Sequence, residues 1–200
     1  DIVEKCKTDL EEDIVHEGKN ALMEIEATDT HHDLPRYVGM LKYRTSYGQN
    51  LLQHCLEVAH LAGAMAAEMG LDVKLARRAG LLHDIGKPRT KTIETGGKIR
   101  FLNHGIVGAD LAREVLIRLR FSSKAVNFVT TLIRHHMRPS QIYAEGRLPT
   151  DKAIYRYHRD LTDTANDLLF LSLADYLAAV QEKFDSKYWL YRCTITDQVL

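Results

Sequence analysis

The chain has 200 residues, of which 45% are hydrophobic and 27% charged, with 4 Pro and 12 Gly. These proportions are typical of a folded globular protein and exclude a disordered, collagen-like or fibrous chain. The formal net charge is zero, but residues 1–33 contain 11 acidic and 3 basic residues, which leaves residues 34–200 with a net charge of +8. We therefore expect an acidic extension over residues 1–33 and one larger, basic domain over residues 34–200.

The basic character of residues 34–200 has two interpretations. On charge alone, the simpler one is a solvated face balanced by the acidic extension; the other is attraction of phosphate esters or nucleic acid. The longest apolar run, residues 168–174, is far shorter than the roughly 18 residues of a membrane span, and no secretory signal is visible. Three cysteines without a Cys-x-x-Cys pair fit a reducing compartment. We expect a cytoplasmic protein without a membrane partner.

The first half of the chain has the apolar periodicity of helices. Residues 2–27 predict an amphipathic helix, which is also a candidate surface for homo-oligomerisation. Turn-forming residues at 28–35 predict a break before a short helix at 35–42. Two further helices are expected at 48–69, ending before a glycine, and at 72–83.

The second half continues in the same way after one interruption. Residues 89–101 alternate β-favouring and polar residues around Gly96-Gly97, which predicts a small β-hairpin or ordered loop and is the only strand candidate. The remaining expected helices lie at 104–118, 123–136, 151–160, 163–182, with the apolar stretch 168–180 buried, and after Ser186. The predicted class is all-α.

Histidines and aspartates occur where a metal site would need them. Asp175 is the only charged residue in the apolar segment 168–181, where an ionised carboxylate is costly unless it is paired or binds a cation. His83 and Asp84 follow an apolar turn at a helix end, where the departing backbone can direct two adjacent side chains to one point. His54 lies on the inward stripe of its helix. Imidazoles and carboxylates from separate helices form the metal sites of helical bundles.

The motif His83-Asp-Ile-Gly-Lys87, with upstream His54 and downstream His104, His135-His136 and Asp175, resembles the HD superfamily of metal-dependent phosphohydrolases in its HDIG form. The resemblance covers essentially the whole chain and implies an all-α HD-domain bundle with an N-terminal helical extension. Residues 43–87 are similar to the catalytic domain of ribonuclease Y, and residues 1–42 resemble the stretch before that domain. Residues 88–180 are similar to the HD domain of bacterial tRNA nucleotidyltransferases of the CCA-adding and poly(A) polymerase group.

The resemblance implies a set of metal ligands. The mononuclear set of the superfamily corresponds to His54, His83, Asp84 and Asp175, and the dinuclear form adds His104, His135 and His136. The sequence therefore permits one or two divalent ions, with Asp84 as a bridge. Imidazole-rich ligands favour the transition metals Mn, Fe, Co, Ni or Zn, and Mg is also compatible.

The resemblance also implies hydrolysis of phosphate esters, in nucleotides (cyclic or 2′- or 3′-phosphorylated ones included) or in RNA, by a metal-activated water. Asp84 and Lys87 are the expected catalytic residues, because Lys87 is close enough in sequence to offset charge on the phosphoryl oxygens. His104 and His135 could instead donate a proton to the leaving oxygen. The residues expected to bind the substrate phosphate are Lys87, Arg134 and Arg138.

A second hypothesis belongs to a different class. The chain would then be a non-catalytic RNA- or nucleotide-binding HD module in which the metal is structural. In that case Lys87 is a solvated lysine at a helix end and contacts no phosphate. The sequence feature that favours the enzyme is the complete ligand set together with Lys87.

Overall fold

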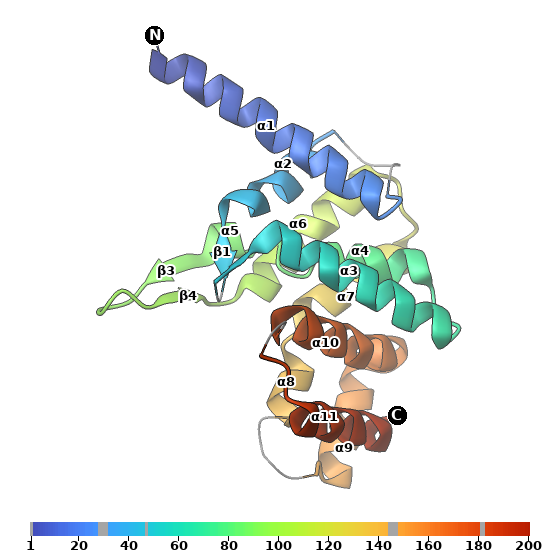
Figure 1. Ribbon diagram of the computed structural model, residues 1–200. Helices are drawn as coiled ribbons and strands as arrows, with labels where there is room; N and C mark the ends of the chain where they lie inside the picture. Colours follow the sequence, from blue (N-terminus) through green and yellow to red (C-terminus); the bar gives the residue numbers. More distant parts are fainter. Residues whose placement is uncertain (1, 28–31, 47, 144–147, 181–182) are drawn as a thin grey trace.

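The computed structural model of the protein describes residues 2–27, 32–46, 48–143, 148–180 and 183–200. Within these ranges it is a bundle of helices with two short antiparallel strand pairs (Figure 1), which confirms the predicted all-α class. No helix in the described ranges combines the length and the apolar character that a bilayer span requires.

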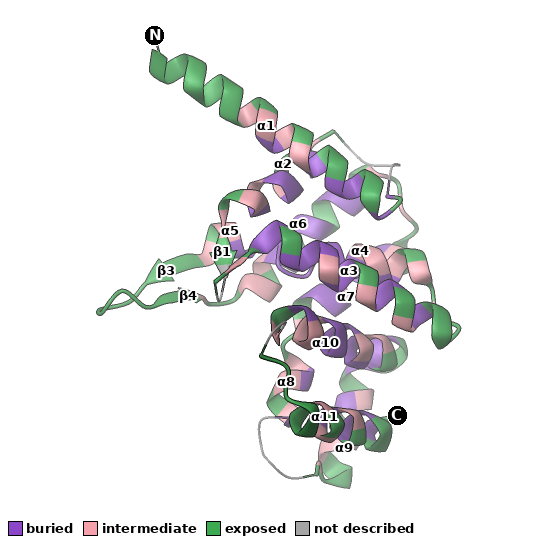
Figure 2. Ribbon diagram, viewed as in Figure 1, coloured by how far each residue is buried: buried purple, intermediate pink, exposed green. Residues whose placement is uncertain are grey.

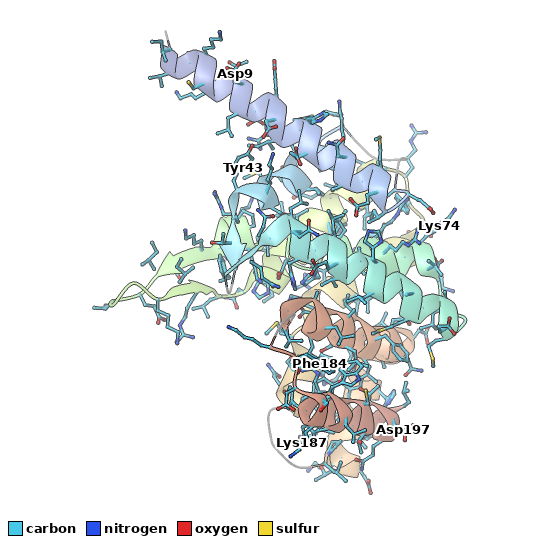
Figure 3. All side chains as sticks on the ribbon, viewed as in Figure 1. Asp9, Tyr43, Lys74, Phe184, Lys187 and Asp197 are labelled. Carbon is cyan, nitrogen blue, oxygen red and sulfur yellow. The ribbon has the colours of Figure 1, made fainter. Side chains whose placement is uncertain are left out.

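The N-terminal helix packs on the bundle with its second half only. The elements here are α1 (Ile2–Glu24), α2 (Leu34–Gly39) and the 3-10 helix η1 (Met40–Tyr43). The first half of α1 projects from the bundle and is exposed, whereas Ile14 and Leu22 are buried (Figure 2). Tyr43, labelled in Figure 3, donates a hydrogen bond to Asp13 of α1. The domain boundary at residue 33 and self-association through this helix stay predictions.

Five helices surround the centre of the molecule and bury its core. They are α3 (Leu51–Glu68), α4 (Val73–Leu82), α6 (His104–Arg118), α7 (Ser123–His135) and α10 (Ala165–Val180). The helix α3 begins at Leu51 rather than at the expected Gly48, because the Asn50 side chain accepts hydrogen bonds from the backbone of Leu52 and Gln53 and caps the helix. Leu51 belongs to a core cluster shared with α1, α2 and α6, and Val58 to a second cluster shared with α10. The helix α3 therefore joins the two halves of the core.

The remaining helices cover the C-terminal side of the bundle. They are α9 (Asp151–Leu161), the 3-10 helix η2 (Thr162–Thr164) and α11 (Ser186–Val199). The predicted burial of the 168–180 segment is confirmed for its first half, where Leu168, Leu169 and Ala174 of α10 are fully buried, whereas Ala179 near its end is exposed. Ile195 and Val199 of α11 join the same core cluster. Side chains fill the space between α10 and α11, next to the connection that contains Phe184 (Figure 3).

The strand predictions need one correction. The expected hairpin at 89–101 is confirmed as β3 (Lys91–Ile93) paired with β4 (Ile99–Phe101), and it projects from the bundle in Figure 1. The expectation that it is the only strand pair was wrong, because β1 (Thr45–Ser46) pairs with β2 (Gln49–Asn50). Strands of two residues have no alternating pattern that the sequence could reveal. The short helices α5 (Lys87–Thr90) and α8 (Arg138–Tyr143) were also not predicted.

Candidate metal centre

Two glycines allow the backbone segments that carry the His and Asp side chains to approach one another. A Cβ atom at Gly80 of α4 would lie 2.7 Å from Ala59 Cα, so this glycine lets α4 pack directly on α3, which carries His54. A Cβ atom at Gly86 would lie 2.1 Å from the His104 carbonyl oxygen at the start of α6. Both contacts require glycine, and together they bring His54 and His104 to opposite sides of the His83-Asp84 turn.

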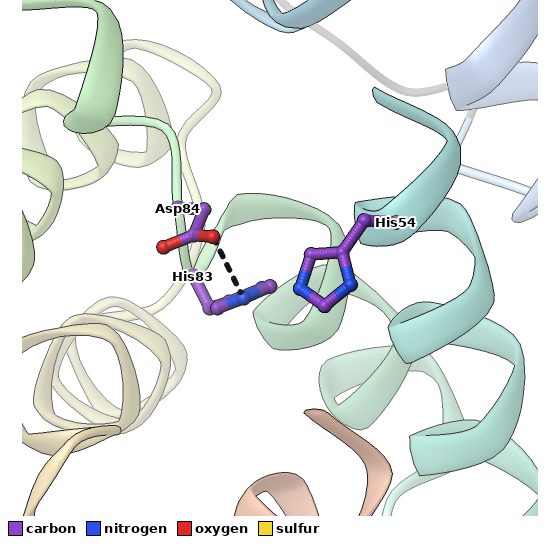
Figure 4. A group of neighbouring side chains, drawn as sticks. All are labelled: His54, His83 and Asp84. Carbon is purple, nitrogen blue, oxygen red and sulfur yellow. Dashed lines mark ion pairs between the residues drawn. The ribbon is translucent and has the colours of Figure 1, made fainter. Parts of the chain in front are cut away.

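The first group of side chains consists of His54, His83 and Asp84 (Figure 4), each of which offers one potential ligand atom within 4.8 Å of the others. His83 Nε2 lies 3.3 Å from Asp84 Oδ2. Asp175 of α10 extends this group, since its Oδ1 lies 3.1 Å from His54 Nε2 and 3.8 Å from His83 Nε2. Among the described residues, His54 Nδ1 and His83 Nε2 are buried without a hydrogen-bond partner. Buried nitrogen atoms left in this state are costly unless another ligand satisfies them.

The second group shares Asp84 and adds His104 and His136. Asp84 Oδ1 lies 3.3 Å from His104 Nε2 and 3.8 Å from His136 Nε2. The two Nε2 atoms are 3.0 Å apart. The Asp84 carboxylate is therefore placed to bridge the two groups with its two oxygens.

Backbone hydrogen bonds orient three of the imidazole rings. The Nδ1 atom of each ring lies 2.7 Å from the carbonyl oxygen three residues earlier: Gly80 for His83, Phe101 for His104 and Ile133 for His136. A carbonyl oxygen only accepts, so each Nδ1 must donate, and in the neutral ring Nε2 is left with a free lone pair. The Nε2 atoms all face Asp84. This outer-shell arrangement is typical of histidines that bind metals in proteins.

Charge and burial both act on the central carboxylate. Burial disfavours ionisation of Asp84, but the neighbouring His83 and Lys87 outweigh it and hold the pKa of Asp84 well below its usual range. Burial opposes ionisation of Asp175 in the same way, but the hydrogen bond from His54 and the charge of His83 lower its pKa to about 2. Burial, reinforced by repulsion from His83, lowers the pKa of His136 to about 4. At neutral pH the centre thus has two anionic carboxylates and a neutral His136, as metal ligands require. Burial disfavours the charged form of His83, but the Asp84 carboxylate outweighs it and raises the pKa of His83, so a metal ion would have to displace a proton from this ring.

Lys87 is part of this centre. Its Nζ lies 2.5 Å from Asp84 Oδ2, and the residue is 8% exposed. Burial favours the neutral amine, but the Asp84 carboxylate overcomes this effect and raises the pKa of Lys87. A protonated ammonium group is therefore held at the edge of the ligand cluster, next to the ring of Phe101, whose centroid is 5.6 Å away.

The cluster lies at the base of a cavity of about 830 Å³. One wall is the β3–β4 hairpin, with Lys98, Arg100 and Phe101, and another includes Tyr176 of α10 and Arg192 of α11. Cavities of this size bind ligands as large as a nucleotide. Because His54, Asp84, His104, His136 and Asp175 line this cavity, a ligand in it would reach the cluster.

Comparison with known proteins agrees with this geometry. Residues 51–180 match the family model of the HD domain. The chain belongs to the HD-domain family. This match includes every predicted ligand in the cluster and confirms the resemblance seen in the sequence.

Curated relatives of this HD domain are named ribonuclease Y. The one from Fusobacterium nucleatum is 43% identical over 136 residues, which are 68% of this chain and 24% of that protein. The relative from Acetivibrio thermocellus is 44% identical over 68% of this chain and 23% of its own length, and the one from Thermobifida fusca is 48% identical over 55% and 21%. The matched part of the chain spans less than a quarter of these relatives. A match of 136 residues also extends beyond residue 87, where the sequence resemblance to ribonuclease Y was expected to end.

The residues of this HD domain fit a divalent metal. The ligand atoms are imidazole nitrogens and carboxylate oxygens, which suit Mn, Fe, Co, Ni and Zn. The unpartnered His54 Nδ1 and His83 Nε2, and the facing Nε2 atoms of His104 and His136, are the observations that a bound cation would explain. The two groups around Asp84 offer room for one ion or two.

Three predicted site residues lie apart from this cluster. His135 belongs to neither group, although it is adjacent to His136; its nearest charged neighbours are Arg138, Arg134 and Asp160. At the end of α7 the two adjacent side chains point in different directions, and only His136 lies within reach of Asp84. Arg134 pairs with Asp110 at 2.7 Å and Arg138 with Asp160 at 2.8 Å, and neither lines the cavity. The structure thus does not bring His135, Arg134 or Arg138 to the ligand cluster.

Sequence reasoning missed the residues of the cavity walls, and Arg192 is the buried cation among them. Arg192 of α11 is buried, donates to the carbonyl and hydroxyl oxygens of Ser172, and lines the cavity. The only signal in the sequence is a basic residue among aromatic ones, Tyr188-Trp-Leu-Tyr-Arg192. Such a pattern is equally typical of an exposed amphipathic helix.

Proposed function

We propose that this HD domain is a metal-dependent phosphodiesterase that hydrolyses RNA. The observation that carries the proposal is the Asp84 carboxylate held between two groups of imidazole nitrogens, with a protonated lysine beside it. The relatives named ribonuclease Y, of which the match covers less than a quarter, support RNA as the substrate class.

The proposed ligands are His54, His83, Asp84 and Asp175 for one ion, with His104 and His136 completing a second position around Asp84. A bound divalent ion would supply a Lewis acid that polarises a phosphoryl oxygen and lowers the pKa of a coordinated water. The protein fixes the orientation of the ligands through the backbone hydrogen bonds of His83, His104 and His136.

Lys87 is proposed to act on the substrate directly. Its ammonium group lies against Asp84 at the base of the cavity, where a phosphate bound to the ligand cluster would meet it. Because burial excludes water around Lys87, its charge acts more strongly on a phosphoryl oxygen than it would in solution. The charge on those oxygens changes most in the transition state, so Lys87 is expected to contribute mainly to kcat.

The basic wall of the cavity is proposed to hold the RNA chain. Lys98 and Arg100 of the hairpin line the cavity and are exposed. Arg100 pairs with Glu94 at 2.7 Å, and an exposed pair of this kind is weak enough to exchange for a phosphate. Neutralisation of several phosphates would make RNA binding decrease with rising salt concentration.

The test is hydrolysis of a short single-stranded RNA and of bis(p-nitrophenyl) phosphate by protein as purified and after addition of Mn²⁺. We expect turnover that Asp84→Asn abolishes and that His135→Ala, a matched change next to the cluster, retains. Metal content is measured on the same samples. Protein that contains metal and binds the RNA but cleaves neither compound would favour the non-catalytic binding module.

A further inference from the structure

We infer that Arg192 binds a second phosphate of the substrate, adjacent to the one that is cleaved, and that α11 thereby determines which substrate ends the site prefers. This inference rests on the proposed phosphodiesterase function and adds a residue that lies outside the HD match at residues 51–180. It depends on the charge, the burial and the position of Arg192.

Arg192 is a buried cation that pairs with no anion among the described residues. The residue is 4% exposed and carries a guanidinium group. Its Nη2 donates hydrogen bonds to the carbonyl oxygen of Ser172, at 2.9 Å, and to the Ser172 hydroxyl, at 3.2 Å. Both acceptors are neutral. Among the residues described by the structure, Arg192 forms no ion pair, and its Nε is buried without a hydrogen-bond partner.

The aromatic rings around Arg192 orient it but do not balance its charge. The guanidinium carbon lies 4.1 Å from the ring centroid of Tyr143 and 4.5 Å from that of Tyr176. Such cation–π contacts hold a guanidinium in one plane. They do not use its hydrogen-bonding capacity, and Nε has no hydrogen-bond partner among the described residues. A buried cation in this state is costly, which favours an anion that completes the site when substrate binds.

Other arginines in the structure serve as a comparison. Arg44 and Arg77 also have a buried Nε without a partner, but neither lines the cavity. Arg77 is already balanced by Glu26, at 3.1 Å. Of these three arginines, only Arg192 combines an unpartnered Nε with a position in the cavity wall.

The position of Arg192 links it to the ligand cluster. Its hydrogen-bond acceptor Ser172 and the proposed ligand Asp175 are three residues apart on α10, so they lie on the same face, less than one helical turn from each other. Ser172, Asp175 and Arg192 all line the one cavity. A substrate phosphate at Asp175 and its ligand cluster would therefore bring a neighbouring phosphate of the same chain toward Arg192. A planar guanidinium is well suited to bind it with two hydrogen bonds.

The kinetic test compares three dinucleotides: ApA, which has one phosphate, and pApA and ApAp, which carry a second phosphate on either side. We expect the wild-type holoenzyme to favour one of the two longer compounds over ApA by about tenfold in kcat/KM, as one charge-assisted hydrogen-bonded pair would give. Arg192→Met should remove this preference while the rate with ApA is retained, and Arg192→Lys should restore part of it. Arg77→Met is the matched control. Equal losses with all three dinucleotides would show a structural role only and overturn the inference.

A binding measurement separates this inference from the proposed function. Analogues with a methylphosphonate in place of the internal linkage resist hydrolysis, and their affinity for the protein as purified can be measured by calorimetry with and without the terminal phosphate. Tighter binding through the terminal phosphate, lost in Arg192→Met, supports the site even if no RNA is cleaved. Equal affinities overturn it. Should Arg192→Met fail to fold, the Nε–H resonance of Arg192 in wild-type protein provides the readout, since it must shift on addition of the phosphorylated analogue alone.

Discussion

His104 Nε2 and His136 Nε2 face each other at 3.0 Å, although both rings use their Nδ1 atoms as donors to backbone carbonyls. Two neutral rings in this state present lone pairs to each other. Such an arrangement is unfavourable unless a cation or a proton lies between them. Burial lowers the pKa values of both rings, which disfavours the proton. The contact is therefore best explained if the two Nε2 atoms are ligands of one metal ion.

This relationship predicts how the two groups around Asp84 differ. We expect His104→Ala to remove the ion bound at the His104–His136 position. An ion held by His54, His83 and Asp175 should remain. Asp84→Asn, which affects both groups, should remove metal retention almost completely. Elemental analysis of protein purified without chelator measures both effects, and His135→Ala should have wild-type content. Full metal content in Asp84→Asn would contradict the assignment.

Lys87→Ala should separate chemistry from metal binding. We expect full metal occupancy and a kcat reduced by about a hundredfold, as for the loss of one preorganised charge at a reacting centre. Lys87→Arg should recover only part of the rate, because the planar guanidinium group is wider than the lysine ammonium group and cannot occupy the same position beside Asp84. Lys74→Ala, on the exposed side of α4 (Figure 3), is the control for a lost lysine. Wild-type turnover in Lys87→Ala would remove Lys87 from the mechanism.

Asp175→Asn should destabilise the metal-loaded protein more than the metal-free protein. If the change weakens metal affinity a hundredfold, the loaded form loses about 2.7 kcal/mol of stabilisation. For a chain of this length that corresponds to a decrease in Tm of about 5–10 °C. Thermal melts with and without chelator give the comparison. Identical shifts in both forms would mean that Asp175 is only the structural partner of His54.

Gly86→Ala should affect both folding and the metal centre. Its new methyl group would lie 2.1 Å from the His104 carbonyl oxygen, so α6 must move away from the His83-Asp84 turn. Overpacking of this kind costs about 1–3 kcal/mol. We expect a lower Tm in the metal-free protein and a loss of the ion that depends on His104. A variant with normal Tm and normal metal content would show that the backbone at Gly86 and His104 can accommodate a side chain without moving α6.

The sequence was informative wherever one residue conflicts with its surroundings. Asp175 is a lone charge in an apolar helix, and the structure places its half-buried carboxylate beside His54 and His83. His135 was assigned from the resemblance to the dinuclear form of the HD superfamily, but only His136 of the pair lies in the cluster. Arg192 could not be identified because its burial depends on how α11 packs against α8 and α10, and periodicity does not report such packing.

The contact between Gly80 and Ala59 has a consequence for the metal itself. Gly80 supplies the carbonyl that orients His83, and it packs on the backbone of the helix that carries His54. The distance between these two proposed ligands is thus set by the separation of α3 and α4. A substitution anywhere along this helix pair that widens the gap by a few tenths of an ångström would change the coordination geometry before it unfolds the protein. A measured change in metal affinity would therefore report a change in the separation of α3 and α4 before any loss of stability is detected.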